Sequence, residues 1–236
     1  MNFIYKNEVV DYDFFDNSKK DTILFLHGWG SNKNAFISTI NLLKHSYNIL
    51  TLTMPTTQNT NLTWNLFDYK NLVVNLLSTH NIKQVSIVCH SFGFRVASVL
   101  NRFVKIKKIV ITGGAGPKKF SIFKKISHEN NKVLLKNAKF SYIYKKIASK
   151  DYLSLSPINK ETFKNIVNLN TKNLIKFNCP VLLFWGKQDH ETPLWIAKKI
   201  KTNNNAELIT TNAGHFAYLD NNSLFNNLVI GFLKWY

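Results

Sequence analysis

The amino-acid sequence predicts an α/β fold in which a mostly parallel central sheet is covered by helices on both faces. Short, continuously apolar runs of strand length alternate with longer amphipathic runs along most of the chain. Strands buried on both faces read as such apolar runs, and their alternation with helices is typical of a parallel sheet. A length of 236 residues suits a single α/β domain. We therefore expect one domain over residues 1–236.

The expected elements follow one another without an internal repeat or linker. Strands are predicted at residues 2–15 (as a pair), 22–26, 48–53, 84–88, 107–112, 180–185 and 206–211. Helices are predicted at residues 33–46, 64–80, 92–103, 192–202 and 220–235. The alternation stops at residues 117–178, where lysine-rich, aromatic, helical patterns take over. The core is thus expected at residues 1–116 and 179–236, with 117–178 as an insertion.

The strand at residues 22–26 leads into the glycine-rich run His27-Gly28-Trp29-Gly30-Ser31. Two closely spaced glycines allow the backbone to turn sharply. The same pattern also fits a tight connection between a strand and a helix that has no chemical role. Whether this run has a chemical role therefore depends on the motifs that follow it.

Ser91 lies where the apolar strand at residues 84–88 changes into a helical pattern. A serine at such a turn is typical of a nucleophile elbow, whose strained backbone projects the hydroxyl above the sheet. The turn needs small residues two positions before and two positions after the serine. Gly93 meets this need, and Cys89, which departs from the strict glycine, is small enough to fit. Ser91 is therefore the candidate nucleophile.

A carboxylate and a histidine that suit such a serine follow it along the chain. Asp189 lies in the loop after the strand at 180–185, and His215 follows the strand at 206–211. A serine hydroxyl is a poor nucleophile at neutral pH and needs a base, a task that suits imidazole. A carboxylate then orients the imidazole and stabilises its charged form. The chain order Ser, acid, His differs from the orders in chymotrypsin and subtilisin.

Four motifs in register make the chain resemble the α/β-hydrolase family over nearly its whole length. They span residues 27–30, 90–93, 186–189 and 214–216. The resemblance is to single-domain bacterial serine hydrolases or esterases with a short helical lid. It implies that the backbone N–H groups of Trp29 and Phe92 form an oxyanion hole. It also implies that the insertion at residues 117–178 is the lid.

Residues near these motifs are candidates for the substrate pocket. They are His27, Gly28, His90, His190, Phe120, Phe123 and Phe216. Aromatic residues at helical spacing usually pack, so Phe120 and Phe123 also fit a role in anchoring lid helices. The sequence has no Cys–His metal cluster, and neither a metal nor a cofactor is expected.

The formal net charge of +18 is large, and much of it lies in the insertion. Such a field can recruit an acidic carrier protein or an anionic lipid surface. The alternative is that an AT-rich genome favours lysine codons. Lysine then fills the solvated surface and gives the same net charge without any binding partner. Only Arg95 and Arg102 are arginines, and phosphate recognition favours arginine, so nucleic acid is not expected.

The N-terminus shows no secretory signal, no run is long enough to span a bilayer, and the two cysteines suit reduced thiols. The sequence thus predicts a cytoplasmic serine hydrolase. It would cleave a carboxylic ester of small-molecule size through a triad of Ser91, His215 and Asp189 and an acyl-enzyme. Alternatives left open are a thioesterase or acyl-carrier-protein ester hydrolase, a carbon–carbon bond hydrolase, a small peptidase, and a hydrolase-fold binding module without turnover.

Overall fold

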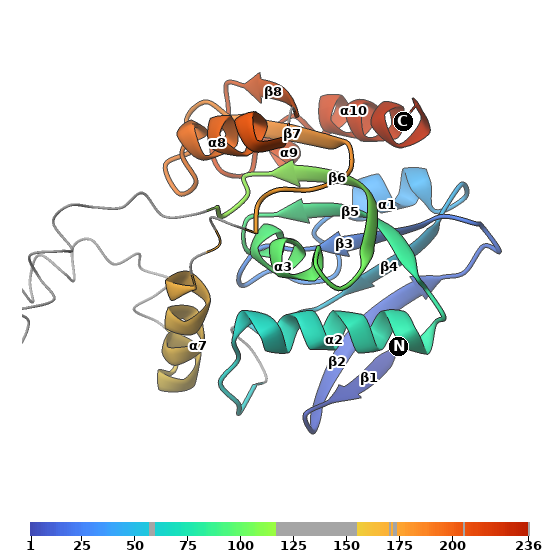
Figure 1. Cartoon of the computed structure of the whole chain (residues 1–236), viewed down its shortest axis with the longest axis vertical. Helices are drawn as coiled ribbons and strands as arrows, with labels where there is room; N and C mark the ends of the chain where they lie inside the picture. Colours follow the sequence, from blue (N-terminus) through green and yellow to red (C-terminus); the bar gives the residue numbers. More distant parts are fainter. Residues whose placement is uncertain (57–59, 117–154, 170, 172–173, 205, 236) are drawn as a thin grey trace, which may run out of the picture.

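An eight-stranded sheet with the order β1-β2-β4-β3-β5-β6-β7-β8 forms the centre of the molecule (Figure 1). The computed structural model describes residues 1–56, 60–116, 155–169, 171, 174–204 and 206–235. The strands are β1 (Asn2–Tyr5), β2 (Glu8–Phe15), β3 (Thr22–Leu26), β4 (Asn48–Leu52), β5 (Gln84–His90), β6 (Lys105–Thr112), β7 (Val181–Gly186) and β8 (Glu207–Thr211). The helices are α1 (Ile37–Leu43), α2 (Leu66–Thr79), α3 (Phe92–Leu100), α7 (Pro157–Asn168), α8 (Leu194–Asn204), α9 (Ala217–Asp220) and α10 (Asn222–Trp235).

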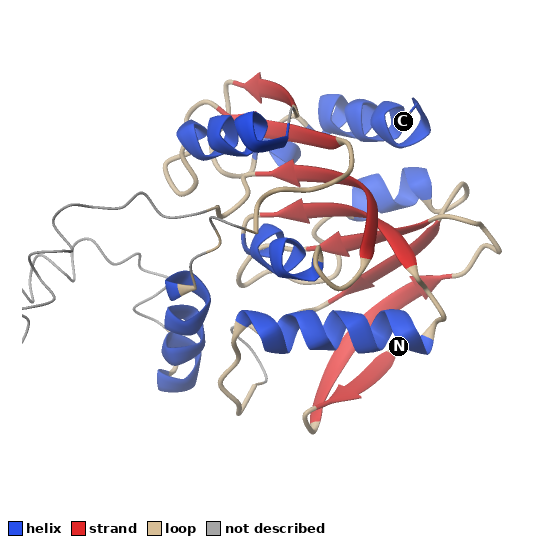
Figure 2. Ribbon diagram, viewed as in Figure 1, coloured by secondary structure: helices blue, strands red, loops and turns tan. Residues whose placement is uncertain are grey.

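From β4 to β8 along the sheet, neighbouring strands pair in parallel. The pairs β1–β2 and β2–β4 are antiparallel. Leu24 of β3 faces Leu50 on one neighbouring strand and Ile87 on the other. Because these strands run in the same direction, the loops that follow them meet at one edge of the sheet. Figure 2 shows this edge at the left, where the strand arrows end.

Alternate side chains of each central strand pack on opposite faces of the sheet, as its pleat requires. Leu24 and Leu183 belong to the cluster that α2, α3 and α8 cover. Phe25 and Phe184 belong to the cluster on the other face, with side chains of α1, α9 and α10. All four residues are 1% exposed or less. Both faces are therefore covered, which confirms the predicted mostly parallel α/β fold.

The predicted strands all form, but two predicted helices differ from the observed ones. The helix expected at residues 33–46 is α1 alone, because the chain before it is held in turns. There, the Lys33 N–H donates to Thr53 Oγ1 at 3.2 Å, and the Asn34 N–H donates to Asn32 Oδ1 at 2.9 Å. The helix expected at 220–235 is α10, preceded by the separate short helix α9.

Helix α7 is the described helix of the insertion at residues 117–178. Ser156 caps its first turn by accepting from the Asn159 N–H at 3.2 Å, and Pro157 occupies its first position. The Thr162 hydroxyl oxygen accepts from the Trp64 N–H at 3.0 Å, and Ile166 is buried against the core. These contacts hold α7 beside the edge where the parallel strands end (Figure 1).

The described part of the chain contains no helix that is long and apolar enough to cross a membrane. The same residues contain no group of three or more histidine, cysteine or acidic side chains arranged to hold a metal ion. Cys89 and Cys179 are free thiols.

We expect Asn65→Ala to lower the free energy of unfolding by about 1 kcal/mol, because Asn65 caps α2. Its side chain accepts from the N–H groups of Phe67 and Asp68, and Asp68 accepts from the Asn65 N–H in return. Urea denaturation of the purified variant measures the loss. Asn71→Ala is the control, because Asn71 is exposed within the same helix and alanine favours helix there. An equal loss in both variants would contradict the capping role.

Candidate active site

Ser91 occupies a strained turn between β5 and α3. Its backbone angles are φ 49° and ψ −112°, a region that residues other than glycine rarely adopt. The turn is held on both sides, because the Ser91 N–H donates to the Thr112 carbonyl at 3.2 Å and the Ser91 carbonyl accepts from the Ala115 N–H at 3.0 Å. The loop after β6 thus supports the elbow, and the Ser91 side chain lines a cavity.

Gly93 allows the first turn of α3 to lie directly against the end of β3. A Cβ atom at this position would stand 2.2 Å from the Leu26 carbonyl oxygen and 2.9 Å from that of His27. Both are backbone atoms and cannot move aside independently. Cys89, on the other side of the serine, is fully buried with its Sγ 3.5 Å from the Val110 carbonyl oxygen. The packing thus accepts cysteine where the strict motif has glycine.

Two backbone N–H groups beside Ser91 are unused. Within the described residues, the N–H groups of Trp29 and Phe92 donate to no protein acceptor. The Trp29 ring packs edge-on against the Phe92 ring, with centroids 5.6 Å apart. The loop itself is fixed, since the Gly30 N–H donates to Thr56 Oγ1 at 3.2 Å. These two groups are available to an anionic oxygen in the cavity.

His27 supports this loop from beneath. Its Nε2 accepts from the Met54 N–H at 2.8 Å, so the proton resides on Nδ1, which donates to the Gly28 carbonyl at 2.6 Å. Burial lowers the pKa of His27 to about 4, so the ring is neutral at physiological pH. His27 does not line the cavity, which corrects its prediction as a pocket residue: both of its ring nitrogens are bound to backbone.

His215 and Asp189 form a buried hydrogen-bonded pair. His215 Nδ1 lies 2.9 Å from Asp189 Oδ2, and the other oxygen, Oδ1, accepts from the N–H groups of Glu191 at 2.9 Å and Thr192 at 2.8 Å. Thr192 Oγ1 donates to Oδ2 at 2.7 Å. Burial raises the pKa of Asp189, but the hydrogen bonds from His215 and Thr192 outweigh it and lower the pKa. The ionised carboxylate therefore fixes the proton of His215 on Nδ1.

Gly186 brings the loops of Asp189 and His215 together. A Cβ atom at Gly186 would stand 2.2 Å from the carbonyl oxygens of Ala213 and Gly214. The adjoining Gln188 N–H donates to the Ala213 carbonyl at 3.0 Å. Because the ends of β7 and β8 approach this closely, the acid from one loop reaches the imidazole from the next.

The second ring nitrogen of His215, Nε2, lies 3.4 Å from Glu191 Oε2. Ser91 and His215, both in the described part of the chain, line the same cavity but make no hydrogen bond with each other. The Glu191 side chain is 68% exposed, so it can leave this position at little cost. Sequence reasoning did not identify Glu191 as a neighbour of the imidazole.

His90 is neutral, and its side chain makes a hydrogen bond to the backbone. Its Nε2 donates to the His215 carbonyl at 3.2 Å, and the two rings lie 4.6 Å apart. Burial, together with the adjacent His215, lowers the pKa of His90 to about 3. The ring lines the cavity beside Gly28, where a Cβ atom would stand 2.7 Å from His90 Nδ1. His90 thus joins the loop of Gly28 to the loop of His215.

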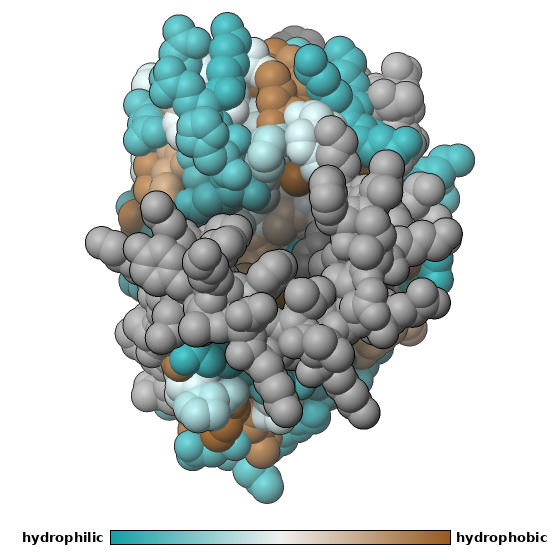
Figure 3. Space-filling view, turned by 90° about the vertical axis from the view of Figure 1, so that its left-hand side faces the viewer, coloured by the Kyte–Doolittle hydropathy of each residue, from teal (hydrophilic) through white to brown (hydrophobic). Residues whose placement is uncertain are grey.

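A cavity of about 700 Å³ connects these groups. Figure 3 faces the ends of the parallel strands and shows hydrophobic surface within a hollow there. Much of the lining is apolar or aromatic, including Trp29, Phe92, Phe163, Val167, Trp195 and Ile196. A cavity of this size, with an apolar part and several polar side chains, suits a small organic ligand.

The cavity includes four of the seven predicted pocket residues. Gly28, His90, His190 and Phe216 line it, whereas Phe120 and Phe123 lie outside the described residues. Sequence reasoning missed Thr192, although a hydroxyl residue three positions after an aspartate is a signal of a local turn in which the carboxylate accepts backbone N–H groups. It also missed Arg95, for which the sequence gives no signal.

No family model matches the chain. The hydrolase YugF of Bacillus subtilis (strain 168) is 22% identical to it over 95% of this chain and 94% of YugF. A hydrolase structure from Pseudomonas aeruginosa PA01 has a TM-score of 0.76 at 13% identity, covering 99% of this chain and 98% of that one. An enol-lactonase from Burkholderia xenovorans LB400 has a TM-score of 0.75 at 12% identity, covering 99% and 100% of the two chains.

We expect Gly93→Ala to lower the free energy of unfolding by about 1–3 kcal/mol, because the new methyl group overlaps backbone at the end of β3. The control is Gly231→Ala in α10, where a Cβ atom would meet nothing within 4 Å and where alanine favours helix. Chemical denaturation compares the two variants. A Gly93→Ala protein as stable as Gly231→Ala would contradict the close approach.

We expect the stability of the protein to fall as the pH drops below about 6.5, partly because of His90. The folded pKa is about 3 against 6.5 for a free histidine, so the unfolded chain binds the proton first. This contribution is complete at neutral pH and decreases by about 2 kcal/mol by about pH 5.

His90→Gln removes that contribution, so its free energy of unfolding should change less than that of the wild type between neutral pH and about pH 5. The exposed His45, substituted as His45→Gln, is the control and should behave like the wild type. Urea denaturation at each pH gives the comparison. An unchanged pH dependence in His90→Gln would show that His90 is not buried in its neutral form.

Proposed function

The chain has the α/β-hydrolase fold, and from this premise we propose that it is a serine hydrolase that cleaves a carboxylic ester. One observation carries the proposal: the Ser91 elbow, the His215–Asp189 pair and two unused N–H groups surround one cavity. A buried carboxylate and a strained serine both cost stability, which favours a chemical role for them.

In the first step, His215 Nε2 removes the proton from Ser91 Oγ as that oxygen attacks the ester carbonyl carbon. Nε2 is free to accept because Asp189 holds the other ring proton on Nδ1. Glu191, which lies 3.4 Å from Nε2 and is largely exposed, turns into solvent as the substrate enters. The ionised Asp189 then stabilises the imidazolium that forms.

Attack places a negative charge on the former carbonyl oxygen. The N–H groups of Trp29 and Phe92 receive it, and each such donor is typically worth about 3 kcal/mol of barrier lowering. Their loops are fixed before the reaction by His27 and by the turn at Ser91, so they need little reorganisation. The imidazolium then gives its proton to the leaving alcohol, and the acyl group stays on Ser91.

Water completes the cycle. His215 Nε2 takes a proton from a water molecule as that water attacks the acyl-enzyme, and the returning proton restores the Ser91 hydroxyl. The likeness to an enol-lactonase supports an ester over an amide, because a lactone is a cyclic ester. The apolar and aromatic part of the lining supports a small acyl group with an apolar chain next to the ester.

We expect a fluorophosphonate probe to label the wild-type protein, and Ser91→Ala and His215→Ala to abolish the labelling. Hydrolysis of p-nitrophenyl hexanoate should fall roughly 10⁴-fold or more in both variants, because the residues act as one unit. Gel fluorescence of the labelled protein and release of p-nitrophenol measure the two effects.

Ser31→Ala is the matched control, because Ser31 is another serine that lines the cavity. Its labelling should equal that of the wild type. A folded wild-type protein that stays unlabelled and hydrolyses no ester would overturn the proposal and favour a binding role. Labelling that persists in Ser91→Ala would place the nucleophile elsewhere.

A further inference from the structure

Arg95 is a buried guanidinium in the wall of the cavity. It lies one helical turn after Ser91 on α3, and only 4% of it is exposed. Its Nη1 donates to the Gly116 carbonyl at 3.2 Å, and its Nη2 donates to the carbonyls of Ile166 and Leu169 at 2.7 Å each. Its Nε is buried and has no hydrogen-bond partner among the residues that the structure describes.

The positive charge of Arg95 has no acidic counterpart among the described residues. All three recorded acceptors are neutral carbonyls, and no ion pair of Arg95 is found there. Burial lowers the pKa of Arg95 to about 10, so the guanidinium is still charged at neutral pH. A buried charge without a partner of opposite sign is costly, and a bound anion would relieve that cost.

Anchoring of α7 explains part of this arrangement. Ile166 and Leu169 stand at the C-terminal end of α7, where carbonyls lack helical partners and the helix dipole favours a cation. This role uses two of the five N–H bonds of the guanidinium, and a third donates to Gly116 in the loop after β6. The Nε–H and one Nη1–H remain. The Nε–H is covered by protein, so the remaining Nη1–H of this cavity-lining residue is the donor offered to a ligand.

We propose that Arg95 is an anion subsite, which binds a carboxylate carried by the acyl part of the ester substrate. The proposal rests on the hydrolase function proposed above and names its substrate class. Arg95 would be a binding residue: it holds the far end of the substrate and takes no part in proton transfer.

The acyl side follows from the position of His215. Because the imidazolium must protonate the leaving alcohol, that alcohol lies on the His215 side of the cavity. The neighbours of His215 there, His190, Glu191 and Phe216, are exposed. Arg95 is buried, so it belongs to the closed side, where the acyl group remains attached to Ser91.

The distance between the two groups limits the substrate. Ser91 directly precedes α3, Arg95 lies in the first turn of that helix, and both line one cavity, so a short acyl chain is expected to reach from one to the other. Aromatic side chains of Trp29, Phe163 and Trp195 line the same cavity, so the connecting segment is expected to be apolar. The substrate class is therefore the half-ester of a short dicarboxylic acid.

Paired substrates test this subsite: p-nitrophenyl hydrogen adipate, which carries the carboxylate, and p-nitrophenyl hexanoate, which does not. We expect the wild type to show a kcat/KM at least tenfold higher for the adipate ester. Arg95→Met should reduce this ratio about tenfold or more, and Arg95→Lys should retain part of it. Damage to α7 alone would lower kcat/KM for both esters alike and leave the ratio unchanged.

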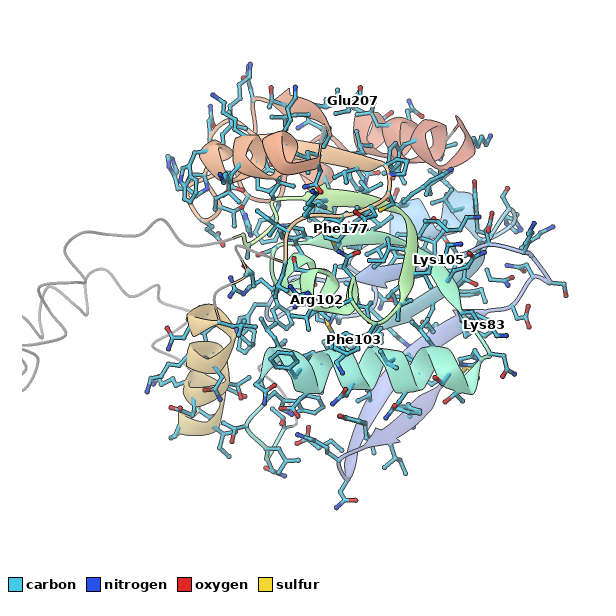
Figure 4. All side chains as sticks on the ribbon, in the orientation of Figure 1. Lys83, Arg102, Phe103, Lys105, Phe177 and Glu207 are labelled. Atoms are coloured by element: carbon cyan, nitrogen blue, oxygen red, sulfur yellow. The ribbon has the colours of Figure 1, made fainter. Side chains whose placement is uncertain are left out.

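Arg102→Met is the matched control, because Arg102 is the other arginine of the chain. It follows α3, is exposed and makes no contact with the cavity (Figure 4). Its ratio should equal that of the wild type. A wild type that prefers the neutral ester, or a ratio that Arg95→Met leaves unchanged, would overturn the subsite and leave Arg95 as an anchor of α7.

Binding without turnover separates this proposal from the hydrolase function. Calorimetry of the Ser91→Ala protein should show that monomethyl adipate binds at least tenfold more tightly than methyl hexanoate. The preference should disappear when Arg95→Met is added. Binding with this preference in a protein whose wild type neither labels nor hydrolyses esters would support the subsite and reject the hydrolase. Equal binding of the two compounds would reject the subsite.

Discussion

The approach of Gly93 to the backbone at the end of β3 is the contact on which the rest of the site depends. It lets α3 begin directly beside the loop that follows β3, so that Trp29 and Phe92 line the same cavity as Ser91. The strained turn at Ser91 persists because backbone hydrogen bonds to the β6 strand and its following loop hold it from both sides. Position and strain therefore have one common origin in the packing of a helix onto a sheet.

A second glycine contact assembles the other half of the site. Gly186 allows the ends of β7 and β8 to touch, and this contact brings Asp189 to His215. His90 connects the two halves, since its ring donates to the His215 carbonyl and packs against Gly28. The proposed chemistry thus needs two loops placed by glycine and one neutral histidine between them.

Sequence reasoning predicts the parts of this site that local geometry dictates. The elbow is visible because a strand, a serine and a small residue must occur in that order, and the order Ser, acid, His follows from the chain path. Glu191 and Arg95 escape it, because Glu191 approaches His215 of another loop and Arg95 binds the end of α7. Thr192 was missed although its spacing from Asp189 is a local signal. His27 was predicted in the pocket, yet its two ring nitrogens satisfy backbone beneath the loop, which no linear pattern reveals.

The most direct test of the proposed chemistry is a crystal structure of the protein after reaction with a small alkyl fluorophosphonate. The phosphorus should be bonded to Ser91 Oγ, and its free oxygen should lie about 3 Å from the backbone nitrogens of both Trp29 and Phe92. His215 Nε2 should face the adduct, with Glu191 turned away. An adduct on another residue, or a phosphonate oxygen that contacts neither N–H group, would contradict the arrangement proposed for this site.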